Sequence, residues 1–352
     1  MSRTEHGVRP VRFRFRAMNT DVEVQLATGL EEAMQAEALI RNWFETQERR
    51  FSRFLPDSEL SRLNRSTGWM PVSAAMDEVL SLAYGYMGQT EGMFQPGILP
   101  ALREQGYEAS FGQEMNGFAP QPSMTDQSRI TEIMRTHERS VHSTTEPYDY
   151  SRPRWIQREG SRMVHIDHGT QLDLGGIVKG WTVERIAEWL RRTLRIPAGM
   201  INAGGDMQTW GTSDHPAWTI YVTDPFLEKR NLTGSIQLRC GAVATSGIWR
   251  RRWRLADGSI GHHLIDPRTM ASAETDVLQC TVLGKHASQC EIIAKTVCIL
   301  GSEDALRWLN RHHDPHDVLW ITKEGNIIFR GDTELLEERW PGIDPDHRFH
   351  LL

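Results

Sequence analysis

The spacing of apolar and polar residues along this chain predicts both helices and strands. Apolar residues three and four positions apart predict helices over 30–50, 74–87, 291–300 and 303–311. Ser58 is a good N-cap and predicts a further helical segment over 59–63. Short alternating or continuously apolar runs predict strands at 22–26, 163–166, 171–174, 200–202, 218–222, 235–238, 242–244, 278–283, 318–321 and 327–329. This mixture predicts an α+β fold.

Two adjacent glycines join one predicted strand to a predicted helix in residues 173–189, DLGGIVKGWTVERIAEW. Gly175 and Gly176 let a ligand approach the backbone, and the first turn of the following helix offers free N–H groups and a positive dipole end. Such a corner attracts phosphate. Lys179 lies in this first turn, where the dipole disfavours a cation. We therefore expect it to have a compensating carboxylate such as Asp173, to face a bound anion, or to point into solvent.

Length and composition limit the class of protein. The chain has 352 residues, 39% hydrophobic and 24% charged, which is typical of a soluble globular protein with one large or two coupled domains. No apolar run is long enough to span a membrane, and the N-terminus has no signal-peptide core, so we expect a cytoplasmic protein without membrane insertion. The net charge of -6 disfavours nucleic-acid binding, and the basic run 249–253 is more simply explained as an alternating strand.

Other compositional features bear on domain organisation. The four cysteines lack metal-binding spacing, and we expect them to be reduced thiols. From about residue 106 to 154 the chain becomes polar, with one helical piece predicted at 130–134. We interpret this stretch as an insertion in a single domain spanning 10–332. Residues 1–9 and 333–352 are predicted to be polar tails.

Four polar clusters follow predicted strands, where functional groups are commonly displayed. They contain Asp173 with Lys179, Asn202 with Asp206, Thr245 with Ser246, and His262 with His263 and Asp266. The chain lacks both the dinucleotide spacing G-x-G-x-x-G and the P-loop Gly-Lys-Ser/Thr at these glycines. A simple dehydrogenase or NTPase assignment is therefore disfavoured.

Taken together and in order, these motifs resemble those of one family, the FAD:protein FMN transferases, also called the ApbE family. The resemblance covers the chain from Met18 to about Gly301. The family's motifs correspond to Met18–Thr20, Ser58–Asn64, Asp173–Gly180, Asn202–Asp206, Ala244–Gly247 and His263–Thr269.

The resemblance implies a bilobed α+β fold, similar to the T-fold, with a mixed sheet and packed helices. It further implies that the protein binds FAD, splits its pyrophosphate with a divalent metal, usually Mg²⁺, and transfers FMN to a Thr or Ser hydroxyl of an acceptor flavoprotein. The reaction needs cations at the phosphates, a base near the hydroxyl and a dry pocket for the flavin.

Individual roles follow from the same resemblance. His263 matches the candidate base, although a turn histidine bonded to Asp266 or to the backbone is the structural alternative. Phe54 could stack on the flavin or adenine, but is equally well explained as plain core. Asp206 could orient a phosphate-binding loop, although we favour a residue that satisfies its own turn. Thr245 and Ser246 could donate hydrogen bonds to a phosphate, but are equally good turn formers. FAD contacts are expected at Met18, Phe54, Met93, Phe94, Gln95, Asp173, Lys179 and Ile265.

The chain departs from the family at the expected metal site. The family uses an Asp, a Thr or Ser one turn later, and a backbone carbonyl that corresponds to Gly176. Here those two helix positions hold Glu291 and Lys295, and an ammonium cannot ligate a cation. Glu291 then either forms a capping box with Ser288, or ligates the metal, or pairs with Lys295, which supplies the positive charge instead. Gln95 and Met270 are further departures.

Three functions are consistent with this reading. The first is the FMN transferase, with His263, Lys179 and Lys295 as the catalytic residues and Gly176 and Glu291 as metal ligands. The second is an FAD-binding protein without transfer activity, and the third is an FAD pyrophosphatase that uses water in place of the acceptor hydroxyl.

Overall fold

A nine-stranded sheet is the centre of the structure, a computed structural model that describes residues 10–107, 155–226, 232–255 and 258–351. Its strand order is β1-β2-β6-β7-β10-β15-β16-β17-β18. Neighbouring strands are antiparallel except β17 and β18, which are parallel, so the sheet is mixed as expected. The bounds are β1 Val11–Ala17, β2 Thr20–Leu26, β6 Gly199–Ala203, β7 Asp206–Trp210, β10 Gly241–Gly247, β15 Val277–Gly284, β16 Asp317–Thr322, β17 Ile327–Gly331 and β18 His347–His350.

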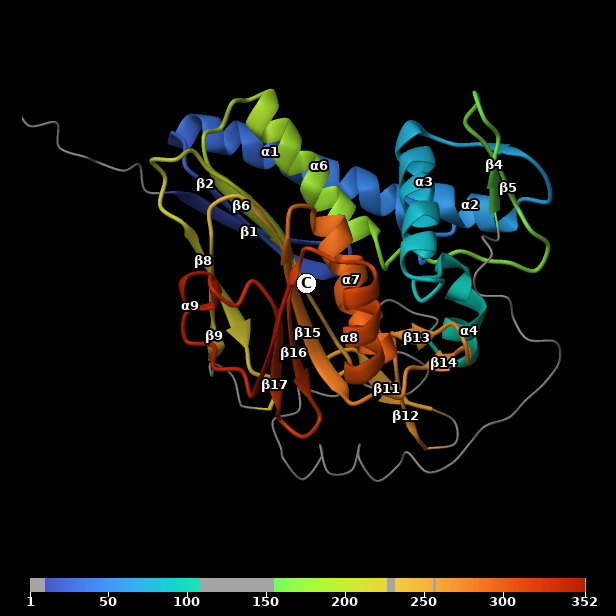
Figure 1. The fold of residues 1–352 in the computed structure, drawn as a ribbon. Helices are drawn as coiled ribbons and strands as arrows, with labels where there is room; N and C mark the ends of the chain where they lie inside the picture. Colours follow the sequence, from blue (N-terminus) through green and yellow to red (C-terminus); the bar gives the residue numbers. More distant parts are fainter. Residues whose placement is uncertain (1–9, 108–154, 227–231, 256–257, 352) are drawn as a thin grey trace, which may run out of the picture.

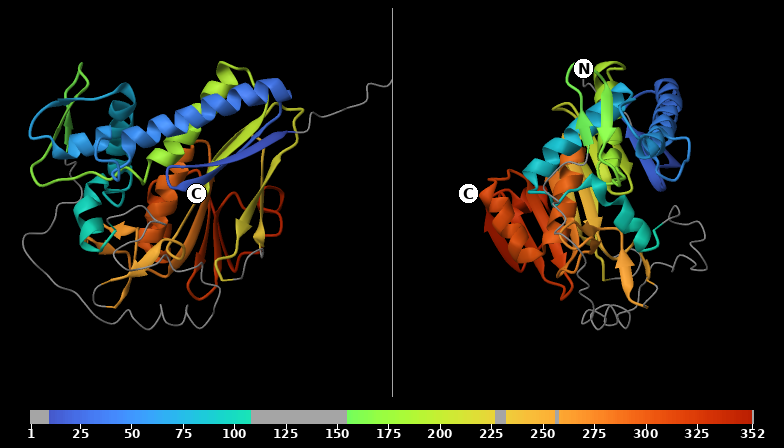
Figure 2. Two further views of the ribbon diagram at one scale, coloured as in Figure 1. Left: turned by 180° about the vertical axis from the view of Figure 1, so that it is seen from behind. Right: turned by 90° about the vertical axis from the view of Figure 1, so that its right-hand side faces the viewer.

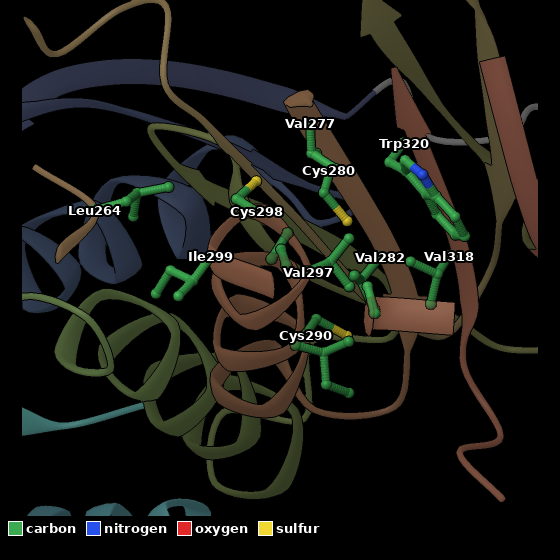
Figure 3. Close-up of a cluster of buried hydrophobic side chains, with 14 of the residues drawn as sticks. Leu264, Val277, Cys280, Val282, Cys290, Val297, Cys298, Ile299, Val318 and Trp320 are labelled. Atoms are coloured by element: carbon green, nitrogen blue, oxygen red, sulfur yellow. The ribbon is translucent and has the colours of Figure 1, made fainter. Parts of the chain in front are cut away.

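Helices cover one face of this sheet (Figure 1). They are α1 (Leu30–Phe51), α6 (Val178–Arg192), α7 (Ala287–Leu300) and α8 (Ser302–Arg311). Helix α7 is almost entirely buried, and its Cys290 and Val297 meet Val282 of β15 and Val318 of β16 in the apolar core (Figure 3). A helix that is buried on nearly all sides holds the groups on it rigidly.

The opposite face is covered by a hairpin and a short helix. Strands β8 (Trp218–Thr223) and β9 (Leu232–Leu238) form the hairpin, and α9 (Leu336–Arg339) packs beside it. Together with the sheet they enclose a second apolar core that contains Ile220, Leu319 and Trp340. The sheet is therefore buried on both faces, which explains the continuously apolar character of β15 and β16.

A smaller lobe lies to one side of the sheet, and α1 runs from the edge strands β1 and β2 toward it (Figures 1 and 2). The lobe consists of α2 (Glu59–Arg65), α3 (Ala74–Gln89), η1 (Pro96–Ile98), α4 (Leu99–Glu104) and the three-stranded sheet β3 (Met70–Pro71), β5 (Met163–Ile166) and β4 (Trp155–Gln157). Its apolar core is continuous with α6 through Trp181. The predicted bilobed α+β fold is confirmed.

Two small hairpins carry the chain between β10 and β15. They are β11 (Arg252–Arg254) with β12 (Ile260–His262), and β13 (Ile265–Asp266) with β14 (Ala271–Ser272). Only part of the basic run 249–253 is therefore a strand. Both hairpins lie near α4 (Figure 1), and Trp253 and Ile265 share an apolar cluster with Leu102.

Several local predictions were wrong. Residues 171–174 form no strand, because the backbone of Leu172 is bonded on both sides to the Asn64 amide (2.7 and 2.9 Å) and the Asp173 amide bonds to the Pro96 carbonyl (2.8 Å). Strand β1 was missed as the partner of β2. Helix α7 begins at Ala287, four residues before its predicted start.

The predicted tail at 333–352 is also wrong. Leu336, Trp340 and Ile343 are buried in the core behind the sheet, and β18 extends the sheet beyond β17. Apolar residues separated by polar turns are enough to anchor such a segment.

Other predictions lie wholly or partly outside the described residues. These include the predicted tail 1–9 and all but the first two residues of the predicted insertion at 106–154, with its helical piece at 130–134. The four cysteines are free thiols, Cys240 exposed and the others buried, in agreement with the prediction. In the part of the chain that the structure describes, no helix has both the length and the apolar character needed to cross a membrane.

The contact between α6 and α7 depends on one glycine. A Cβ atom on Gly180 would lie 2.7 Å from the Ala287 carbonyl oxygen and 2.8 Å from the Ser288 Cα. We expect Gly180→Ala to lower the free energy of unfolding by about 1–3 kcal/mol, since backbone must move to make room. Chemical denaturation measures this difference.

Gly85→Ala in α3 is the matched control, because nothing lies within 4 Å of a Cβ atom there. Alanine should raise the free energy of unfolding by about 0.5–1 kcal/mol at that position. An equal effect of both substitutions would contradict the tight helix crossing.

Candidate functional site

The turns that carry the motifs lie next to one another. Met18 and Asn19 form the β1–β2 turn, both with positive φ, and Thr20 follows them. Gly204 in the β6–β7 turn has φ +67°, and a Cβ atom on it would lie 2.0 Å from the Thr20 hydroxyl oxygen. Glycine is therefore required at this close approach. Two motifs that are far apart in sequence share one end of the sheet.

The glycine corner before α6 is held by its own carboxylate. Asp173 accepts a hydrogen bond from the Gly175 amide (2.7 Å) and forms an ion pair with Arg53 (Nε–Oδ2 2.7 Å), whose side chain is 6% exposed. Two such donors hold a carboxylate in one position. Asp173 therefore shapes the corner and does not compensate Lys179.

Lys179 is compensated by two other carboxylates. Its ammonium contacts Asp206 of β7 and lies 2.6 Å from Glu291 Oε1 of α7. Glu291 also accepts from Lys295 Nζ (2.8 Å) and, through Oε2, from the Gly180 amide (2.9 Å). Asp206 consequently does more than satisfy its own turn. A buried cluster of two ammonium groups and two carboxylates joins α6, α7 and β7.

The pKa directions follow from burial and from these partners. Burial alone would lower the pKa of Lys179, but Asp206 and Glu291 outweigh it and raise the pKa. The pKa of Glu291 is lowered, because Lys179 and Lys295 outweigh burial. Burial, together with the charge of Glu291, raises the pKa of Asp206. Burial lowers the pKa of Lys295 despite Glu291.

The capping-box interpretation of Glu291 is wrong. Helix α7 begins after His286, and the Ser288 hydroxyl donates to Glu184 of α6 (2.9 Å) instead of serving a cap. Glu291 is fully buried and all its bonds lead to α6 or to Lys295. It is a tertiary link between helices.

His263 lies within the field of this cluster. Burial lowers the pKa of His263 well below its usual value, and the charges of Arg251 and Lys295 lower it further, as does His262. Its Nδ1 lies 3.4 Å from the Arg251 carbonyl oxygen. His262, by contrast, is buried and its Nε2 lies 3.0 Å from the Ala273 carbonyl oxygen. The ring of His263 is neutral near pH 7, and His262 serves the hairpin.

An aromatic group lies beside the corner. The Arg53 guanidinium lies 4.2 Å from the Phe54 ring centre and 4.6 Å from that of Tyr107, and Tyr107 stacks on Trp253 at 5.0 Å. Ile265 belongs to the same apolar cluster. The predicted contacts Phe54 and Ile265 therefore lie together in one aromatic and apolar cluster.

The other predicted contacts are distributed around the corner. Phe94 approaches Gly176, where a Cβ atom would lie 3.1 Å from its ring. Met93 is part of the main core, and Gln95 accepts from the Gly97 amide (3.0 Å) at the start of η1. Met18 packs against the cores of both lobes. Among these residues, Phe94 and Met18 adjoin the site most directly.

Thr245 and Ser246 lie within strand β10 and not in a turn. The Thr245 hydroxyl pairs with that of Thr281 on β15 at 3.0 Å, so it is engaged inside the sheet. Its expected role at a phosphate has no support in this arrangement.

Sequence reasoning missed three residues at this site. Arg53, Tyr107 and Arg251 surround the corner and the histidine, yet none was selected. Arg53 could have been found, since it directly precedes Phe54 in a segment already singled out. Arg251 belongs to the basic run that we explained as a strand, and Tyr107 to the start of the predicted polar insertion, so only the fold shows that they lie here.

The family model described as the ApbE family matches residues 18–320. The chain belongs to the ApbE family. Among its relatives, the FAD:protein FMN transferase of Vibrio cholerae is 26% identical over 298 residues, covering 84% of this chain and 81% of the relative. The enzyme of that name from Klebsiella pneumoniae is 30% identical over 167 residues, covering 47% of this chain and half of the relative.

Solved ApbE structures have the same fold. The ApbE protein of Thermotoga maritima aligns with a TM-score of 0.75 at 22% identity, covering 94% of this chain and 99% of that protein. The apo flavinyl transferase ApbE of Pseudomonas stutzeri aligns with a TM-score of 0.69 at 17% identity, covering 91% and 93%. At these sequence identities the alignments show that the fold is shared.

The Glu291 carboxylate, which is the side-chain ligand expected beside the Gly176 carbonyl, does not fit a divalent cation. Both Glu291 oxygens accept hydrogen bonds from N–H donors, and two of those donors are ammonium groups that would repel a dication. Among the residues that the structure describes, no group of three or more His, Cys, Asp or Glu side chains could hold a metal ion. The carboxylates of this cluster instead bind the ammonium groups of the two lysines.

Lys179→Met tests the cluster. It leaves Asp206 and Glu291 buried with one ammonium, and we expect the free energy of unfolding at pH 8 to fall by about 3–5 kcal/mol. The loss should be smaller at pH 5, because the carboxyl pKa values rise without Lys179 and protonation then removes the unpaired charge. Urea denaturation of both proteins at the two pH values measures this loss of unfolding free energy.

Arg307→Met is the control for this substitution. Arg307 pairs with Glu303 and Asp304 on the exposed side of α8, and its removal should leave the unfolding free energy nearly unchanged. An equally large loss for Lys179→Met at pH 5 and pH 8 would contradict the unpaired-carboxylate explanation.

Proposed function

We propose that this chain is an FAD:protein FMN transferase, which moves FMN from FAD to a Thr or Ser hydroxyl of an acceptor flavoprotein and releases AMP. The observation that carries the proposal is the convergence of the glycine corner, Lys179 and His263 on one buried charge cluster, in a chain of the ApbE family. The names of its relatives support the same activity.

The roles of the residues follow from chemistry and position. The positive dipole end of α6 favours the pyrophosphate of FAD, and Lys179 adds a fixed positive charge there. Met18, Phe94 and the group of Phe54, Tyr107 and Ile265 offer apolar and aromatic surface for the rings of FAD. Asp173 and Gln95 shape the backbone that receives it.

His263 is the proposed base. Because its pKa is low, its imidazole is neutral at pH 7 and can accept the proton of the acceptor hydroxyl. The hydroxyl oxygen then bonds to the phosphorus of the FMN half, the bond from that phosphorus to the bridging oxygen breaks, and AMP leaves with the bonding electrons.

Magnesium is the metal that the resemblance implies, with Gly176 and Glu291 as its ligands. Since the Glu291 oxygens already accept hydrogen bonds from N–H groups, we derive no step through a metal ion. The acceptor flavoprotein and the cytoplasmic location stay predictions of the sequence.

Product analysis tests the function. Purified protein is incubated with FAD and an acceptor domain that carries a Thr-containing flavinylation segment, and FMN on the acceptor is detected by in-gel fluorescence and mass spectrometry. Transfer with equimolar AMP supports the proposal. Release of free FMN and AMP without acceptor indicates the pyrophosphatase, and tight FAD binding without products indicates the binding protein.

We expect His263→Ala to lower transfer by about 100- to 10,000-fold while FAD binding persists, because only the base is removed. His168→Ala, on an exposed turn of the smaller lobe, is the control and should keep full activity. Added imidazole should partly restore the His263→Ala variant.

The pH profile gives a second test of the base. Since burial, together with the charges of Arg251 and Lys295, holds the pKa of His263 well below 6.5, transfer should keep its rate from pH 8 to 6.5 and fall only at lower pH. Initial rates across pH 4.5–8.5 measure this limb. An acid limb centred at or above pH 6.5 would speak against His263 as the base in this environment.

A further inference from the structure

The Lys295 side chain lies along the glycine corner. Its Cε and Cδ atoms are 3.7 and 3.8 Å from the place where a Cβ atom of Gly176 would be, and its ammonium is 2.8 Å from Glu291 Oε1. Only 14% of the side chain is exposed. A flexible lysine is thus held in one place at the point where the corner and α7 meet.

Two lysine ammonium groups already occupy the space next to the Glu291 carboxylate. Glu291 Oε1 accepts from both Lys179 and Lys295, and Oε2 accepts from the Gly180 amide. A carboxylate has about four acceptor sites, and three of them are used here. A dication on the remaining site would lie a few ångströms from two ammonium charges in a buried region, where such repulsion is strong.

The two lysines are not equally compensated. Lys179 contacts two carboxylates, whereas Lys295 contacts only Glu291 in the described part of the chain, and shares that oxygen with Lys179. An ammonium has three N–H donors, so Lys295 keeps donors for a further acceptor. A phosphate oxygen at the glycine corner is the acceptor that its position favours.

We propose that the Lys295 ammonium takes the place of a divalent cation at the pyrophosphate, so that this chain cleaves FAD without a metal ion. The inference rests on the proposed function, because it concerns the charge at the same phosphates. Negative charge grows on the bridging oxygen as the phosphorus–oxygen bond breaks, and the ammonium neutralises it. The acceptor proton goes to His263, and AMP leaves as the anion.

Metal dependence of the unaltered protein is the first test. Initial rates of FMN transfer are measured after exhaustive chelation and again with millimolar Mg²⁺, and FAD affinity is measured by flavin fluorescence in both conditions. Binding of Mn²⁺ to the chelated protein with FAD is followed by electron paramagnetic resonance. We expect equal rates, equal FAD affinity and no stoichiometric Mn²⁺ site. Rates or FAD affinity that return only with Mg²⁺, or one tightly bound Mn²⁺ for each protein, would overturn the inference.

Substitution of the lysine is the second test. Lys295→Met should lower kcat by about 100-fold and weaken FAD binding more than riboflavin binding, since riboflavin has no phosphate. Lys285→Met removes an exposed lysine just before α7 and should change neither. Circular dichroism checks that both variants fold, and the metal tests on the unaltered protein decide the question if Lys295→Met does not. If the folded Lys295→Met variant keeps the kcat and the FAD affinity of the unaltered protein, the inference is contradicted.

The experiments distinguish a failure of the transferase function from a failure of the proposed role of Lys295. If FAD binds without metal and loses affinity on Lys295→Met, yet no FMN reaches any acceptor, the transferase function fails while the role of Lys295 at the pyrophosphate stands. If transfer occurs only with Mg²⁺, the function stands and the role of Lys295 falls.

Discussion

The buried carboxylate of Glu291 is the interaction on which the site depends. It accepts from Lys179 and the Gly180 amide of α6 and from Lys295 of α7, while Lys179 reaches on to Asp206 of β7. An isolated charge in this environment would be expensive, so each member of the cluster requires the others. The cluster therefore fixes the position of the first turn of α6, where a phosphate would bind.

Packing around the cluster leaves it little freedom. Gly180 allows the backbones of α6 and α7 to touch, and α7 itself is enclosed between the sheet and the other helices. The Asn64 amide and the Arg53 guanidinium hold the approach to the glycine corner from the smaller lobe. Both lobes thus contribute to one rigid corner, which is how a site keeps its geometry without a bound ligand.

Lys295 beside the glycine corner gives the buried cluster a second ammonium group. Both ammonium groups lie against buried carboxylates, so their positive charge is compensated within the fold. Burial lowers the pKa of His263, and the charges of Arg251 and Lys295 lower it further. Lys295 therefore acts on the charge cluster and on His263 alike.

The sequence by itself determined the mixed α+β class, most helices and the order of the motifs, because apolar periodicity and cap residues such as Ser58 act locally. It also identified Lys179, His263, Glu291 and Lys295 as residues to examine. The tertiary structure decided what they do: it made Glu291 a bridge between helices, placed Arg53 on Asp173, and drew residues 336–350 into the core and the sheet. These outcomes depend on contacts between residues more than a hundred positions apart or on burial against another element. Local pattern carries no information about such partners, since the same side chain can cap a helix or link two of them.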